Sequence, residues 1–160
     1  MIKLISLLTL VIEALTQPVK SPEIWTTPIP DFENRHFPNY VLPASKWGAG
    51  HRGIDLLVKD QEQIKSPFSG TVHFQGKVVD RNVLTLKSSS GLLASFEPIC
   101  SNLSAGDEVT KGDQIGHYCA GAENYEEHCE MCIHFSVRSE HGYLNPLIFV
   151  SSIKPSVIVS

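Results

Sequence analysis

The residues from Gly48 onward form short runs rich in β-branched and aromatic residues, and each run ends at a cluster of turn-forming residues. The runs are GTVHFQGKVVD (70–80), NVLTLKSSSGLLASF (82–96), DEVTKGDQIGHY (107–118) and CIHFSVR (132–138). The turns include SSSG, SAGD and KGD. Strands at such spacing pair as antiparallel neighbours. The sequence therefore predicts an all-β fold, an antiparallel β-sheet or sandwich, because no uninterrupted amphipathic helix of normal length follows the first 16 residues.

Side-chain alternation predicts which face of these strands is buried. In TVHF (71–74) and VLTL (83–86) the apolar residues alternate, which predicts one buried and one solvated face. After these strands, Asn145-Pro146 predicts a turn, and the apolar tail that follows is expected to cover an edge of the core.

The chain of 160 residues is long enough for one domain with tails. Residues 1–16 have one lysine, an apolar run and small residues at Ala14 and Thr16, so they resemble a secretory signal peptide. The alternative is a first amphipathic helix packed on the domain. Residues 17–47 form an expected extended arm, rich in proline and aromatic residues, that packs along the domain of residues 48–150. Residues 151–160 are the C-terminal tail.

The charge pattern excludes one class of partner. The net charge is -4, and Lys and Arg form no block that would neutralise a run of phosphates, so nucleic acid is not expected to bind. Cysteine occurs only at positions 100, 119, 129 and 132, so the fold does not depend on a dense disulfide framework. The signal-like segment predicts a secreted or cell-envelope-associated protein.

Two short segments hold the most informative polar residues. On a strand, Cys132 and His134 share one face, while Ile133 and Phe135 point to the other, into the core. His51 and Asp55 would lie about 13 Å apart on a straight strand, so they reach one ion only if the chain bends, which Gly53 allows. Two imidazoles and one carboxylate suit a catalytic zinc. The alternative without a metal is that His51 is an ordinary loop residue and that His134 is a half-buried, hydrogen-bonded strand residue.

The order of five motifs resembles the lysostaphin-like (LytM-type) zinc metalloendopeptidases. The motifs are GHRGIDL, IKSPFSGTV, GDEVTKGDQIG, CIHFSV and GYLNPL, and the resemblance covers roughly residues 48–148. It implies an antiparallel sheet with a groove over it and hydrolysis of stem or cross-bridge peptides in peptidoglycan. It also implies a zinc ion held by His51, Asp55 and His134.

The sequence departs from the family pattern at two catalytic positions. The first histidine of the family's His-x-His motif is catalytic, and Cys132 replaces it here. A second catalytic histidine belongs to a Tyr-x-His-Leu pattern, and the matching stretch, FEPI (96–99), places Pro98 there. These changes are similar to those of a divergent, actinobacterial-looking subgroup of the family.

Three interpretations of Cys132 follow. Its thiolate would be a fourth zinc ligand and close the site; it would pair in a disulfide; or it would act as an acid or base, with His128 or Glu97 replacing the missing imidazole. The pairing itself stays open, since Cys132 would pair with Cys129, while Cys119 would pair with Cys100 or Cys129.

These residues lead to three functional hypotheses. The first is a zinc endopeptidase of cell-wall peptides. The second is a catalytically degenerate protein that binds the cell wall or regulates another cell-wall hydrolase, since a fold does not fix a function. The third is a structural zinc protein with a closed four-ligand site. An open or closed metal coordination shell distinguishes the first hypothesis from the third.

Overall fold

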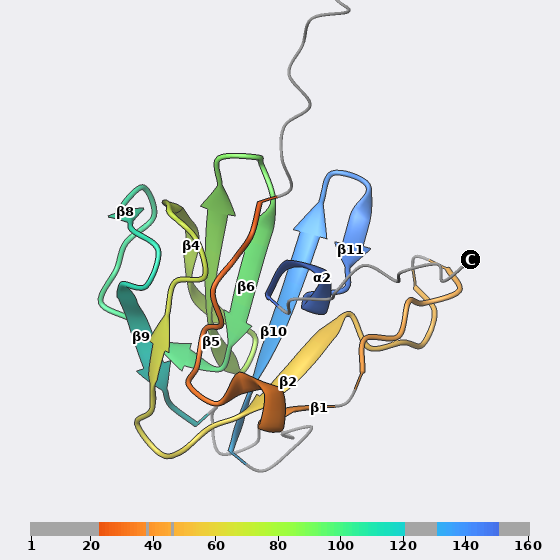
Figure 1. The fold of residues 1–160 in the computed structure, drawn as a ribbon, viewed down its shortest axis with the longest axis horizontal. Helices are drawn as coiled ribbons and strands as arrows, with labels where there is room; N and C mark the ends of the chain where they lie inside the picture. Colours follow the sequence, from red (N-terminus) through yellow and green to blue (C-terminus); the bar gives the residue numbers. More distant parts are fainter. Residues whose placement is uncertain (1–22, 38, 46, 121–130, 151–160) are drawn as a thin grey trace, which may run out of the picture.

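The structure is a computed structural model that describes residues 23–37, 39–45, 47–120 and 131–150 (Figure 1). Its large sheet contains, in spatial order, β1 (His36–Phe37), β2 (Gly53–Leu57), β10 (Cys132–Ser139), β6 (Leu93–Glu97), β5 (Arg81–Ser88), β4 (Gly70–Val78) and β8 (Glu108–Val109), and β11 (Gly142–Leu144) pairs with β10. Its small sheet contains β3 (Gln63–Lys65), β9 (Gln114–Tyr118) and β7 (Ile99–Cys100). Every strand pairing is antiparallel. The predicted all-β, antiparallel fold is confirmed.

The core covers one face of the large sheet. Ile133 and Phe135 of β10 are fully buried, as predicted, and Phe135 stacks on Phe96 of β6 with ring centroids 4.8 Å apart. The small sheet contributes Ile64, Ile99 and Ile115 to the same apolar cluster. Because strand side chains alternate, the other face of β10 carries His134 and Arg138. That polar face carries the candidate site.

The prediction from alternation is wrong at Phe74. Val72 is buried and pairs with Leu86, but the register shifts by one residue before Phe74, which pairs with Thr85. The cause is a β-bulge at His73, where an extra residue reverses the side to which the strand's later side chains point. Phe74 is therefore 40% exposed and lies on the polar face.

The arm packs on the core through some of its aromatic residues only. Trp25 is buried, its ring stacks on Phe149, and its backbone N–H donates to the Phe149 carbonyl oxygen (3.0 Å). Phe32 is also buried, in the 3-10 turn η1 (Phe32–Asn34). Figure 1 shows this part of the arm, in red and orange, crossing the sheet next to α2. Trp47, by contrast, is 86% exposed.

The chain after Pro146 forms α2 (Leu147–Val150), a single helical turn whose Val150 is buried. The signal-like segment 1–16, His128, Cys129 and the tail 151–160 lie outside the described residues. No helix of the described ranges has the length and the apolar character that a membrane span needs.

Candidate metal centre and adjoining groove

His51, Asp55 and His134 come together at one end of the polar face. Asp55 of β2 pairs with His134 of β10, so both side chains point to the same side of the sheet. His134 Nδ1 lies 2.8 Å from Asp55 Oδ1, and His51 Nε2 lies 3.3 Å from the same oxygen. The three donor atoms lie within 4.8 Å of one another. Of the residues that the structure describes, no other group of His, Cys, Asp and Glu has such geometry.

The bend that brings His51 to Asp55 lies at Arg52, and β2 begins at the next residue. Gly53 does not use a left-handed backbone conformation. Its role is steric, because a Cβ there would lie 2.6 Å from His134 Nε2 and 2.4 Å from the Phe135 carbonyl oxygen. The sequence predicted the bend, but the glycine is needed to make room for the His134 ring.

The arm holds His51 in place. Val41 and His51 exchange two backbone hydrogen bonds of 2.9 Å each. His51 Nδ1 lies 3.4 Å from the Asn39 carbonyl oxygen, so in the tautomer with its proton on Nδ1 the ring would donate to that oxygen and present the Nε2 lone pair to a metal beside Asp55. This is the orientation that a metal-binding histidine takes from its second hydrogen bond.

Asp55 is ionised at neutral pH. Burial of its side chain, which is 4% exposed, raises the pKa of the carboxyl group. The hydrogen bond from His134 and its charge, followed by those of His51, outweigh burial and hold the pKa below its ordinary value. The carboxylate is thus in the anionic form that binds a metal.

The distances from Asp55 to the two histidines are close to those between zinc ligands. Zinc ligands at about 2.0–2.1 Å in a tetrahedron lie about 3.3 Å apart from one another. The distances from Asp55 Oδ1 to His51 and to His134 are 3.3 and 2.8 Å. Two imidazole nitrogens and one carboxylate oxygen are also the donors that zinc prefers. The three predicted ligands would therefore hold the ion, and the structure shows no fourth ligand among the described residues.

The three residues predicted as catalytic are Glu97, Cys132 and His128, of which the structure describes the first two. Glu97 is the neighbour of His134 on its other side, in β6, and its Oε2 accepts a hydrogen bond from Arg81 Nε (2.9 Å). Cys132 is buried and disulfide-bonded. A disulfide sulfur has no thiolate to bind zinc and no proton to transfer, so of its three interpretations the structure has the disulfide. His128 lies outside the described residues.

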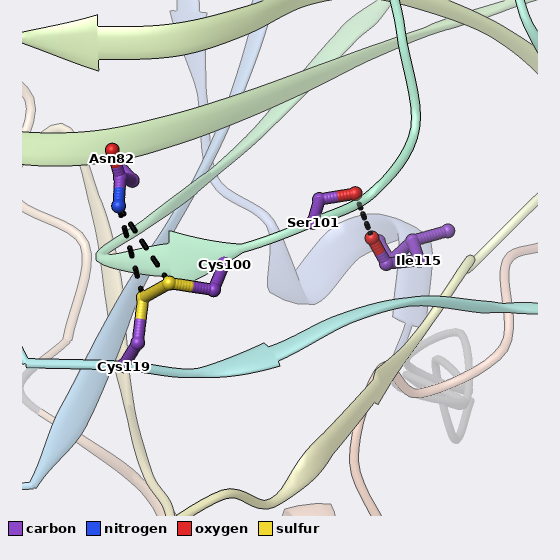
Figure 2. The surroundings of a disulfide bond; sticks show 5 residues. All are labelled: Asn82, Cys100, Ser101, Ile115 and Cys119. Carbon is purple, nitrogen blue, oxygen red and sulfur yellow. Dashed lines mark hydrogen bonds between the residues drawn. A yellow bond between two sulfur atoms is a disulfide. The ribbon is translucent and has the colours of Figure 1, made fainter.

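A second disulfide fixes the chain beyond Glu97 (Figure 2). Cys100 in β7 is bonded to Cys119, directly after β9, which is one of the pairings that the sequence left open. Asn82 in β5 donates to both sulfur atoms, at 3.6 and 3.9 Å, and so connects the large sheet to the disulfide. The disulfide thus crosslinks two neighbouring strands of the small sheet, β7 and β9, directly after Glu97 and Pro98.

A groove adjoins the metal group on the polar face. It is lined by side chains of five strands, namely His73, Phe74, Val78, Val83, Thr85, Ser95, Glu97, Ser136, Arg138 and Tyr143. Its floor is a row of hydroxyl groups, because Ser136 pairs with Ser95 and Ser95 with Thr85, whose hydroxyl lies 2.9 Å from that of Ser95. The sequence motifs missed these residues, although alternation from His134 places Ser136 and Arg138 on its face.

The family follows from a comparison with known sequences. The sequence model of peptidase family M23 matches residues 49–146, which is more than half of the chain. The chain belongs to peptidase family M23. The resemblance to the lysostaphin-like peptidases is thereby confirmed, and the protein has an M23 peptidase-type domain that contains a His-Asp-His group able to bind a metal.

The chain is also similar to uncharacterized relatives and to solved structures. Uncharacterized proteins of Mycobacterium bovis and Mycobacterium tuberculosis are 30% identical over 110 residues, which is 66% of this chain and 43% of theirs. The chain thus spans less than half of their length. The SpoIIIAH–SpoIIQ complex contains a chain with a TM-score of 0.65 and 22% identity, over 79% of this chain and 99% of that one. The lysostaphin catalytic domain from Staphylococcus simulans has a TM-score of 0.61 and 20% identity, over 74% and 93%. These structures share the fold.

Proposed function

We propose that this M23 domain is a zinc metalloendopeptidase that hydrolyses peptide bonds in peptidoglycan. The observation that carries the proposal is the group of His51, Asp55 and His134 at the end of a groove lined with hydroxyl groups. These three residues would hold a zinc ion, which would supply Lewis-acid polarisation of the scissile carbonyl group and activation of the attacking water. The groove would hold the substrate in an extended conformation beside the metal group.

Glu97 is the residue that we assign to proton transfer. Its carboxylate lies on the groove beside His134, where neither Pro98 nor the disulfide-bonded Cys132 supplies the imidazole found in other members of the family. Arg81 holds one carboxylate oxygen, so the other remains directed to a substrate or water in the groove. A carboxylate in this position can accept a proton from the attacking water and pass it to the leaving amine.

We further propose that the protein is exported. The signal-like composition of residues 1–16 supports export. The Cys100–Cys119 bond and the disulfide at Cys132 give independent support, because disulfides persist in oxidising compartments and are rare in the cytosol. Peptidoglycan, the proposed substrate, lies in the cell envelope.

A second candidate function is binding without hydrolysis, either to the cell wall or to a partner hydrolase. It is favoured by the two replaced histidine positions, Cys132 and Pro98. It is also supported by the similar fold in the SpoIIIAH–SpoIIQ complex, which is an assembly of two proteins. A closed zinc site with Cys132 as the fourth ligand is excluded, since Cys132 is in a disulfide and supplies no thiolate.

Metal content and peptidoglycan hydrolysis of the purified protein test these proposals together. We expect about one zinc per chain and release of peptides from peptidoglycan. His134→Ala should lose both, while the control His141→Ala should keep both, because His141 lies on an exposed turn outside the metal group. A protein that binds zinc but releases no peptides would contradict the peptidase proposal and favour the second candidate, binding without hydrolysis. A protein that takes up no zinc would contradict the metal centre itself.

A further inference from the structure

Three basic side chains gather on the groove at the end away from the metal group. Arg138 of β10 pairs with Leu93 of β6, and Leu93 pairs with Lys87 of β5, so Arg138 and Lys87 stand in one row on the polar face. His73, which follows the buried Val72 in β4, lies on the same face by alternation. All three residues line a second hollow, which shares His73 and Arg138 with the groove, so the two hollows adjoin each other.

Unlike Arg35 and Arg81, these basic side chains have no ion-pair partner within the described part of the chain. Arg35 is paired with Glu62, and Arg81 with Glu97. Among the described residues, the side chains of His73, Lys87 and Arg138 make no ion pair and no hydrogen bond. One carboxylate, that of Glu140, lies on the rim, where it contacts His141 (3.3 Å) in an exposed turn. Lys87 and Arg138 together therefore give this end of the groove an excess of positive charge over the single carboxylate of Glu140.

The distance between Arg138 and the metal group follows from their positions on β10. Arg138 follows His134 by four residues on β10, so the two side chains lie on the same face about 13 Å apart. An extended peptide spans about 3.3–3.6 Å per residue. A peptide that lies along the groove with one bond at the metal group would thus bring a side chain or terminus to Arg138 after three or four residues.

We propose that His73, Lys87 and Arg138 form a subsite for a free carboxylate of the peptide substrate. Arg138 would bind the two oxygens through its guanidinium group, and Lys87 and His73 would flank it. The subsite would select acidic peptides and fix which bond lies at the metal group. This proposal rests on the proposed function, because it takes an extended peptide as the occupant of the groove.

Equilibrium binding tests the subsite without requiring hydrolysis. The probes are a fluorescein-labelled stem tetrapeptide with free carboxylates and the same peptide with its carboxylates converted to amides, measured by fluorescence anisotropy at low ionic strength. We expect the full chain to bind the carboxylate form about tenfold more tightly than the amide form. The double variant Arg138→Gln/Lys87→Gln should bind both forms alike.

The matched control is Lys77→Gln, which removes the charge of another exposed lysine on the neighbouring strand β4 that lines neither hollow. It should discriminate between the two peptides as the unaltered chain does. The subsite is overturned if the unaltered chain binds both peptides equally or binds neither, or if the double variant still discriminates. Cleavage of the two peptides is measured separately. Equal hydrolysis of both peptides refutes the subsite but not the peptidase. Discrimination in binding without any hydrolysis refutes the peptidase but not the subsite.

Discussion

Arg81 and Glu97 form an ion pair directly beside the metal group, with Arg81 Nε 2.9 Å from Glu97 Oε2. Arg81 also contacts Asp80 through Nη1 (2.9 Å), so the guanidinium group is held from two sides. Glu97 is in turn the cross-strand neighbour of His134. The ion pair thus orients a carboxylate next to the candidate metal ligands, in a domain that has no imidazole at position 98 or 132.

Replacement of that carboxylate should reduce hydrolysis and leave metal binding intact. We expect Glu97→Gln to lower the rate of peptide release about 10²- to 10⁴-fold, the usual contribution of a positioned acid or base. Zinc content should not change, because Glu97 is not part of the metal group. The measurement is chromatographic quantification of released peptides. A variant as active as the original protein would show that another group transfers the proton, and Glu33→Gln, at an exposed position in η1, controls for the loss of one carboxylate.

Zinc should raise the thermal stability of the protein through His51. A ligand that binds only the folded state, at a hundred times its dissociation constant, stabilises by about 2.7 kcal/mol. In a chain of this size that corresponds to a rise in Tm of roughly 5–10 °C. Differential scanning calorimetry with zinc and with a chelator would measure this rise. His51→Ala should abolish it, and a rise of equal size in that variant would place the zinc elsewhere.

The ion pair between Arg35 and Glu62 should make stability depend on pH. Hydrogen bonds from Arg35 lower the pKa of Glu62; burial opposes them, and the Lys59 N–H (2.7 Å) adds to the lowering. A group with a lowered folded-state pKa stabilises above its unfolded-state pKa, and this contribution is lost as the pH falls through the folded-state pKa. Glu62→Gln should therefore cost about 1–3 kcal/mol at pH 7. At a pH below the folded-state pKa, it should cost almost nothing.

Urea unfolding of both proteins at pH 7 and at a series of acidic pH values would measure this difference. A difference that stays constant with pH would mean that Glu62 stabilises the fold through packing and not through its charge.

The Cys100–Cys119 bond should contribute substantially to stability. It closes a loop with a sequence separation of 19, and such a crosslink is typically worth about 2–4 kcal/mol. The double variant Cys100→Ser/Cys119→Ser should show this loss in urea unfolding. The variant is more informative than a reductant, which would also open the disulfide at Cys132. Unchanged stability would mean that the β7–β9 pairing holds these strands together without the crosslink.

The sequence predicted the strands and the candidate ligands because both leave local patterns. Alternation placed Ile133 and Phe135 in the core and His134 on the opposite face, and the structure agrees. It failed at Phe74, because a β-bulge depends on the pairing with β5 and has no signal in the strand itself. The groove was expected from the family, but its hydroxyl and basic lining was not, since those residues come from strands whose register a single sequence does not contain.

The position of the arm affects how the protein can be shortened for biochemical work. A recombinant fragment that begins near residue 49, where the family match starts, would lack Trp25 from the core, the edge strand β1, and the Asn39–Val41 segment that holds His51. Such a fragment would retain all three candidate ligands in its sequence and still lose the support of one of them. Preparations that appear inactive after this trimming would therefore report on the missing arm and not on the chemistry of the domain.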